Sequence, residues 1–371
     1  MDLAVLLEVR PIVQACWVYL RTPSPEAQAR LSVRSNDLTV TWSHGSRDLF
    51  TQTVSLPPEA STVFQPCEMS SLQQEEKHIS FRIQTSPKNM TGSFALQFVE
   101  PEQNNFQGTC CAPDIPLLTP CVVVCSCCDH NILSKESVTF KRVLPLPSCS
   151  YDASDFFCHN HGDSAINVNP TETDFLYSTF GFHLHLSLLK SKGIVIHCKR
   201  CLSWIGTSDA SRAHLWFSTV NVKLTSASDA LVRKLHPAQE FILVIKEAIK
   251  QCPTVVCRII LSVKVRSDVT HYLLIHVIDR QLTVLTACSS SSIELVSHNV
   301  IKVSFHMEQT SNKIVSEWLN DSLVTACDVS LPVFVQGLKL LSNTSQLIPC
   351  TYRKVQHGFF LAYLSTDLMC P

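Results

Sequence analysis

The sequence lacks the long apolar runs and the charge excess that would associate it with a membrane or with nucleic acid. Its 371 residues carry a net charge of -1 at pH 7. No stretch approaches the roughly 18 uncharged apolar residues of a membrane-spanning helix. Charged residues are only 16% of the chain and apolar residues 45%, which is typical of a globular protein and not of a disordered one. We therefore expect neither a direct nucleic-acid partner nor a membrane.

A secretory signal and a disulfide framework are also missing. The N-terminal apolar stretch contains Glu8 and Arg10 and has no basic region before it. The 18 cysteines amount to about 5% of the chain, below the level that is typical of a disulfide scaffold. These features predict a reducing compartment, where most cysteines remain thiols or bind metal.

What the sequence does contain is two Cys-x-x-Cys pairs, each at the tip of an apolar run. The first pair is Cys125 and Cys128, and the second is Cys198 and Cys201. Each pattern predicts a β-hairpin that carries two thiols on its turn. Residues 129–197 separate the pairs, a spacer far longer than that of a single compact zinc finger. We interpret this spacer as a small domain that is pinned at its two ends.

Two such turns supply four thiolates, which is the ligand set of a closed, structural zinc site. We predict one structural Zn²⁺, held by Cys125, Cys128, Cys198 and Cys201. Three neighbouring residues could instead replace a member of the first pair: Cys121, Cys127 and His130. A four-thiolate site leaves no open coordination position, so it would stabilise the fold and take no part in catalysis.

The pattern of the whole chain predicts an α+β fold that is mostly β. Residues 1–115 read as an N-terminal all-β, sandwich-like domain, with short strands and a hairpin at Asn36-Asp37. Residues 116–210 form the zinc-pinned β domain, and residues 211–371 a C-terminal α+β domain.

The C-terminal domain is expected to contain two helices and several strands. One helix covers residues 238–249 and the other Leu331–Leu341. Two strands, at 271–277 and 281–286, are expected to join at a turn formed by Asp279 and Arg280. The first helix has an apolar stripe formed by Phe241, Val244, Ile245, Ala248 and Ile249.

The spacer contains a further cysteine of interest. After the run Arg142–Ser148, whose two prolines force an extended path, a polar loop carries Cys158, His159 and His161. This set could be a second zinc site, a nucleophile beside a base, a segment that presents Cys158 to a partner, or an ordinary surface loop. His183 and His185 share one face of an expected strand and could be ligands, although two polar residues on an exposed face is the simpler interpretation.

The order of these motifs resembles the HECT-like family of ubiquitin-conjugating-enzyme-binding proteins, which are described as ubiquitin ligases. The similarity is close from Cys125 to Gly206 and looser toward the C-terminus. It implies an E3 ubiquitin-protein ligase that binds a charged conjugating enzyme, notably the cyclin-selective one, and passes ubiquitin to substrates such as B-type cyclins. By position, the family's conjugating-enzyme-binding region falls near Glu240 to Val263. The helix face there could be a docking surface, although packing of the apolar stripe on the sheet is the simpler interpretation of the stripe itself. The resemblance further implies a location in the cytoplasm and partly in the nucleus.

The resemblance also implies an alternative role without catalysis. Members of the family associate with the zinc endonuclease subunit of the cleavage and polyadenylation machinery, which acts in mRNA 3′-end processing. By position, Cys158 with His159 beside it would enter the metal site of that endonuclease and inhibit or protect it. A thiolate is a strong zinc ligand and could displace a bridging hydroxide.

A ligase of the HECT type needs a cysteine that forms a thioester with ubiquitin near its C-terminus. Only Cys327 and Cys350 lie in a suitable region, and neither reproduces the family signature. We therefore expect the protein to act as a scaffold that holds the charged enzyme near its substrate, because proximity alone can supply much of the rate.

Overall fold

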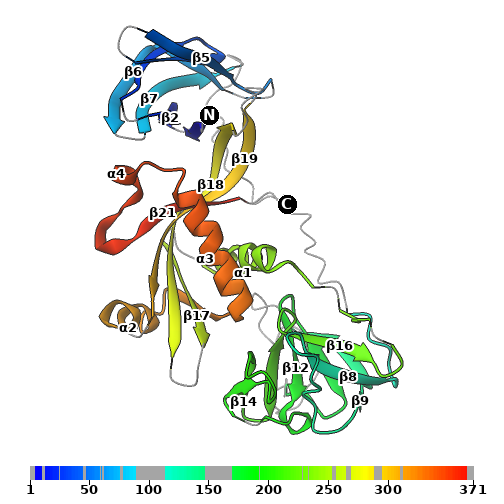
Figure 1. Cartoon of the computed structure of the whole chain (residues 1–371). Coiled ribbons are helices and arrows are strands. Elements are labelled where there is room, and N and C mark those ends of the chain that lie inside the picture. Colours follow the sequence, from blue (N-terminus) through cyan, green and yellow to red (C-terminus); the bar gives the residue numbers. More distant parts are fainter. Residues whose placement is uncertain are drawn as a thin grey trace, which may run out of the picture. The chain divides into compact units, whose positions relative to one another are not determined.

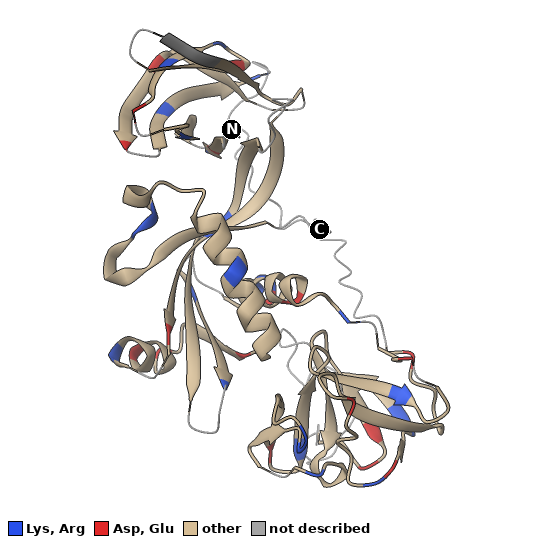
Figure 2. Ribbon diagram, in the orientation of Figure 1, with Lys and Arg blue, Asp and Glu red and all other residues tan. Residues whose placement is uncertain are grey.

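The structure is a computed structural model that describes residues 5–365, apart from 11–12, 25, 45–46, 59, 61, 76–77, 89–112, 147–168, 192, 228, 233, 253–255, 265–268, 288–294 and 310–311. Strands dominate these residues and helices are few (Figure 1), which confirms the α+β, mostly β fold class. Charged residues of both signs are spread sparsely along the ribbon (Figure 2).

The chain divides into two compact units, and each is assembled from separate segments. One unit comprises residues 1–100, 275–306 and 339–371, and the other comprises 101–274 and 307–338. This division differs from the three consecutive segments expected from the sequence. Residues 5–9 of the first strand pair with residues 283–287, so segments that lie far apart in the chain belong to the same unit.

The first unit is built mainly of antiparallel strands. Its N-terminal strands are β1 (Val5–Arg10), β2 (Ala15–Arg21), β3 (Gln28–Val33), β4 (Asp37–His44), β5 (Arg47–Ser55), β6 (Thr62–Glu75) and β7 (His78–Pro87). Its C-terminal elements are most of β18 (Thr270–Ala287), most of β19 (Val296–Glu308), part of α3 (Leu331–Ser345), α4 (Cys350–Arg353), the 3₁₀ helix η4 (Gln356–Gly358) and β21 (Phe360–Ser365). One sheet contains the run β18-β1-β2-β7-β6, and β3-β4-β5 forms another.

The two sheets of this unit bury one shared apolar core. Strands of the larger sheet contribute Leu7, Val18 and Phe81, and the smaller sheet contributes Val40 and Trp42. This arrangement agrees with the sandwich-like interpretation of the N-terminal strands. The predicted hairpin is also present, since β3 and β4 pair from Val33 opposite Leu38.

A buried cluster of charged and polar side chains stabilises the larger sheet. The carboxylate of Glu8 on β1 is 1% exposed, and it accepts hydrogen bonds from Nζ of Lys302 at 2.8 Å and from the hydroxyl of Tyr363 at 2.7 Å. Arg10 completes this group as an ion-pair partner of Glu8. Burial acts to raise the pKa of Glu8, but Lys302, Tyr363 and Arg10 together outweigh it, so the pKa is lowered and the carboxylate stays ionised.

The expected turn at Asp279 and Arg280 is wrong. Strand β18 runs without interruption from Thr270 to Ala287. Ile278 and Arg280 are exposed there, so the polar residues mark a solvent-facing stretch of one strand and not a reversal of the chain.

The second unit contains the cysteine pairs. Its strands are β8 (Pro120–Cys125), β9 (Val138–Thr139), β10 (Arg142–Pro145), β11 (Asp174–Tyr177), β12 (Gly181–His185), β13 (Val195–His197), β14 (Trp204–Asp209), β15 (Arg212–Trp216), β16 (Val220–Leu224), β17 (Cys257–Lys264) and β20 (Val324–Asp328). The 3₁₀ helix η3 (Leu186–Leu188), α1 (Pro237–Gln251), α2 (Lys313–Leu319) and the first part of α3 complete it.

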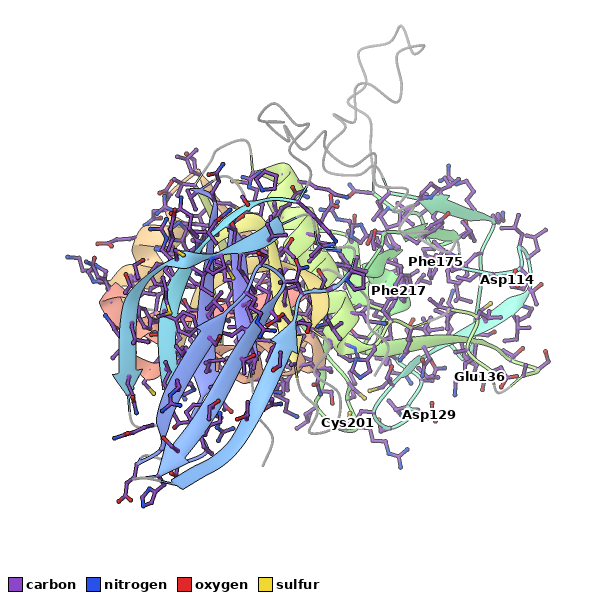
Figure 3. All side chains as sticks on the ribbon, turned by 90° about the horizontal axis from the view of Figure 1, so that it is seen from above. Asp114, Asp129, Glu136, Phe175, Cys201 and Phe217 are labelled. Atoms are coloured by element: carbon purple, nitrogen blue, oxygen red, sulfur yellow. The ribbon has the colours of Figure 1, made fainter. Side chains whose placement is uncertain are left out.

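The core around the cysteines extends from Ile115 to Val232, beyond the boundary at residue 210 that the sequence suggested. The extension includes β15, which pairs with β12, and β16, which pairs with β8 from Val220 opposite Cys125. Three aromatic rings pack together in this core: Phe182 is stacked on Phe175 at 4.5 Å and lies 5.4 Å from Phe217. Phe175 and Phe217 are labelled in Figure 3.

Candidate metal centre and other candidate sites

The two Cys-x-x-Cys turns have the same local structure. Strand β8 ends at Cys125, and the amide of Asp129 donates to the carbonyl of Cys125 at 2.9 Å. The second turn follows β13, and the amide of Leu202 donates to the carbonyl of Cys198, also at 2.9 Å. In both turns the residue after the second cysteine has a positive φ, +52° at Asp129 and +61° at Leu202. This repeated geometry turns both thiols of each pair toward the same side.

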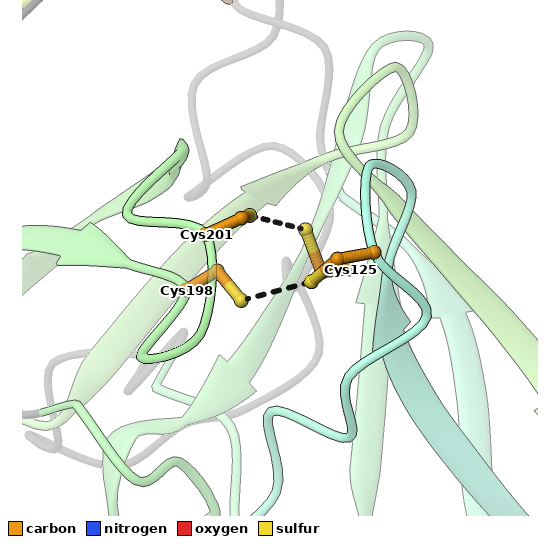
Figure 4. Close-up of side chains that lie close together, drawn as sticks. Cys125, Cys198 and Cys201 are labelled. Atoms are coloured by element: carbon orange, nitrogen blue, oxygen red, sulfur yellow. Dashed lines mark hydrogen bonds between the residues drawn. The ribbon is translucent and has the colours of Figure 1, made fainter.

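The four sulfur atoms meet in one cluster (Figure 4). The Sγ atoms of Cys125 and Cys201 are 3.6 Å apart, as are those of Cys128 and Cys198, and all four lie within 4.8 Å of one another. A tetrahedral zinc with Zn–S bonds of about 2.3 Å separates its sulfurs by about 3.8 Å. Disulfide sulfurs would be only about 2.05 Å apart. The residues therefore fit a four-coordinate metal ion.

The surroundings of the cluster act on its thiols in opposite directions. Burial raises the pKa of the Cys125 thiol to about 12. Partial burial also acts on Cys201, but hydrogen bonding with Ser203, 3.2 Å from its Sγ, outweighs it and lowers that pKa to about 6. A metal ion would displace the protons that remain, because only deprotonated cysteine binds metal strongly.

Cations surround these turns. Lys234 donates to the hydroxyl of Ser126 in the first turn, and its charge acts on Cys125. Nζ of Lys223 lies 2.9 Å from Oδ1 of Asp129. Four thiolates around one divalent ion carry a net negative charge, which the lysines offset.

The three alternative ligands lie outside the cluster. Cys127 is exposed on the turn, and Cys121 is buried with its thiol donating to the carbonyl of Thr119 at 3.5 Å. His130 lines a small separate cavity. Among the described residues, the four cysteines predicted from the spacing are the only group that could hold a metal ion with three or more ligands from His, Cys, Asp and Glu.

The run that begins at Arg142 has a structural partner that the sequence did not indicate. The Arg142 guanidinium binds both carboxylate oxygens of Asp174, with Nε–Oδ1 at 2.7 Å and Nη2–Oδ2 at 2.6 Å. This pair joins the parallel strands β10 and β11 on either side of residues 147–168. Cys158 and His159 lie outside the described residues. Nothing local in the sequence links Arg142 to Asp174, which is 32 residues further along the chain.

The apolar stripe of α1 is buried inside the protein. Phe241 and Ile245 are 0% exposed, and Val244 and Ala248 are also buried. The Phe241 ring lies over Gly337 of α3, where a Cβ atom would come within 2.1 Å of it. The stripe therefore packs the helix into the fold. A docking surface for a conjugating enzyme on α1 remains a prediction, and it would have to be formed by the other faces of the helix.

The two thioester candidates have different surroundings. Cys327 lies half-buried in β20, in parallel register with Leu261 of β17. Cys350 is exposed and is the first residue of the short helix α4. They belong to different units.

No helix in the described part of the chain is both long and apolar enough to cross a bilayer.

Comparison with known proteins identifies one family. The family described as HECT-like Ubiquitin-conjugating enzyme (E2)-binding matches residues 8–360. Searches among curated proteins and among solved structures gave no match. The matched span includes both cysteine turns, the Arg142 run and all the helices. The chain therefore belongs to the HECT-like family of ubiquitin-conjugating-enzyme-binding proteins.

Proposed function

We propose that this protein is a ubiquitin-protein ligase that binds a charged ubiquitin-conjugating enzyme and promotes transfer of ubiquitin to a substrate. The observation that carries the proposal is the family match over residues 8–360. The resemblance of the motifs extends it to the cyclin-selective conjugating enzyme and to B-type cyclins as substrates.

The geometry favours a scaffold over a covalent intermediate. The four-cysteine cluster fits Zn²⁺, which would fix the two turns to each other and leave no open position for chemistry. Cys327 is half-buried within a paired strand. A scaffold needs no nucleophile of its own, because holding the charged enzyme near an amine raises the rate by proximity.

A discharge assay tests the proposal. The protein is mixed with the conjugating enzyme charged with ubiquitin, and samples are separated with and without a thiol reductant. We expect faster loss of ubiquitin from the enzyme and no reductant-sensitive adduct on this protein. An adduct that disappears in Cys350→Ala but persists in Cys327→Ala would instead establish a thioester at Cys350. Unchanged discharge would refute the ligase function.

A second candidate function concerns Cys158 and is supported by a separate observation. The Arg142–Asp174 pair fixes the strands on either side of residues 147–168, so both ends of the segment that carries Cys158 are anchored in the folded domain. An anchored segment could present a thiolate to the metal site of the mRNA 3′-end-processing endonuclease.

The two functions can be separated by one substitution. Cys158→Ala should abolish binding to the endonuclease subunit, measured by co-purification, and leave ubiquitin discharge unchanged. Cys127→Ala, which alters an exposed thiol outside the cluster, is the matched control. Endonuclease binding that survives Cys158→Ala would exclude this role for the cysteine.

A further inference from the structure

Strands β12, β14 and β15 form adjacent parts of one sheet whose two faces differ in character. Side chains alternate along a strand, and Phe182, Leu184 and Leu215 point into the apolar core. The alternate positions carry polar groups, among them His183 on β12 and His214 on β15. This polar face is away from the core that surrounds the four cysteines.

His183 and His214 are direct cross-strand partners. They occupy opposite positions in the antiparallel register of β12 and β15, and their ring centroids are 5.0 Å apart in an edge-to-face arrangement. Gly181 makes room for this pair. A Cβ atom at Gly181 would lie 2.9 Å from Nε2 of His214, so a larger residue there would displace the ring.

The two imidazoles are largely buried and keep unused binding capacity. Nδ1 of His183 is buried and has no hydrogen-bond partner among the described residues. Burial lowers the pKa of His183 to about 3 and that of His214 to about 4, so both rings are neutral at pH 7.

Space for a ligand lies beside the rings. The two histidines border an open hollow of about 250 Å³, and the rest of its lining comes from β14, with Thr207, Ser208 and Asp209, and from β15, with Arg212. The Asp209 carboxylate is already paired with Arg212 at 3.2 Å, so the neutral imidazoles remain the strongest donors in the hollow.

We propose that His183 and His214 form a second metal site, which binds a divalent first-row transition ion such as Zn²⁺ and leaves its remaining positions to water from the hollow. Neutral imidazole is a preferred ligand for zinc, copper and nickel. Two protein ligands make a weaker site than four thiolates, so this ion exchanges readily while the ion of the cysteine cluster does not.

Calorimetric titration of the full-length protein tests the site. Protein that already contains one tightly bound zinc is titrated with Zn²⁺. We expect one further equivalent to bind, and we expect His183→Gln and His214→Gln each to weaken it at least tenfold while the first zinc is retained. His185→Gln is the matched control, because His185 lies on the same strand and face but hydrogen-bonds Ser187 at 2.7 Å.

Proton release provides a second readout. At pH 6 an ordinary histidine is about three-quarters protonated and must lose that proton to bind metal. His183 and His214 are already neutral, so the heat of binding at pH 6 should not depend on the ionisation enthalpy of the buffer. Three results would each overturn the proposal: no second equivalent, a second equivalent that survives both substitutions, or one that His185→Gln weakens equally.

Discussion

Single buried residues determine how this protein responds to pH, and Glu240 is the clearest case. It lies in the first turn of α1, 4% exposed, and accepts a hydrogen bond from the hydroxyl of Ser218 at 3.3 Å. Ser218 also shares a hydrogen bond of 2.8 Å with Ser330, so the group joins three segments of one unit. Burial raises the pKa of Glu240 from 4.5 to about 7.

Glu240→Gln should change the pH dependence of stability. Between pH 4.5 and about 7 the folded protein holds one proton more than the unfolded chain, so stability falls as pH rises through that window. The variant, which cannot ionise, should match the wild type near pH 4 and exceed it by about 3 kcal/mol at pH 8. Urea denaturation from pH 4 to 8 measures this difference. Glu247→Gln, on the exposed side of α1, is the control and should leave the dependence of unfolding free energy on pH unchanged. The account would be contradicted if the unfolding free energies of the wild type and of Glu240→Gln changed with pH in parallel.

Asp174 gives the opposite response. Although buried, it accepts two hydrogen bonds from Arg142 and two from Thr171, and these lower its pKa to about 2. The stabilisation is present above pH 4 and is lost as pH falls toward 2. Because Arg142 is more than half exposed, solvent weakens the ion pair. We therefore expect Asp174→Asn to lower the free energy of unfolding at pH 7 by about 1–2 kcal/mol.

The free energy of unfolding at pH 7 and at pH 2.5 checks this prediction, because the cost should shrink at the lower pH. Asp209→Asn is the control, since that carboxylate is paired with Arg212 at the surface and is 78% exposed. An equal cost at both pH values would show that the charge of Asp174 is not what stabilises the strands.

At the scale of elements, the two cysteine turns show how local geometry prepares a metal site. Both turns need a residue with positive φ after the second cysteine, and the chain places Asp129 in one and Leu202 in the other. Aspartate tolerates this conformation better than leucine, whose Cβ crowds the following carbonyl oxygen at a cost of about 1–2 kcal/mol. Leu202 is 72% exposed, so it recovers little of this cost by packing.

Leu202→Gly should therefore stabilise the second turn by about 1 kcal/mol. Retention of the metal against a competing chelator measures the effect, and the variant should release zinc more slowly than the wild type. Leu202→Ala, which keeps the Cβ atom, should give no such gain. A variant with glycine that loses zinc faster would show that the leucine side chain supports the turn.

The parts of the structure that could be predicted from the sequence are those that depend on residues close together in the chain. The four cysteines could be identified because a metal turn is encoded in the spacing of neighbouring residues. The α1 stripe was equally visible, since helical periodicity is local, but its burial against Gly337 was not. The Arg142–Asp174 pair, the β1–β18 pairing and the position of His214 opposite His183 join residues far apart in the chain, and such pairs leave no local pattern.

For the whole molecule, the two units should respond differently to loss of metal. Cys125 and Cys198 are part of the core that extends from Ile115 to Val232, whereas the core around Trp42 and Phe81 contains no member of the cluster. Removing the metal that the cysteine cluster binds should therefore raise hydrogen exchange across residues 113–146 and 169–232 and leave the described part of residues 5–87 protected. Equal loss of protection in both regions would mean that the metal stabilises the protein as one cooperative body.

The most direct test of the account is the affinity of the full-length protein for a ubiquitin-conjugating enzyme. Biolayer interferometry with the cyclin-selective enzyme, free and charged with ubiquitin, measures it. We predict saturable binding that is lost or strongly weakened in Cys198→Ser, because that substitution removes one of the four sulfurs that join the two turns. Absence of binding by the zinc-loaded wild type would contradict the proposed function of this member of the family.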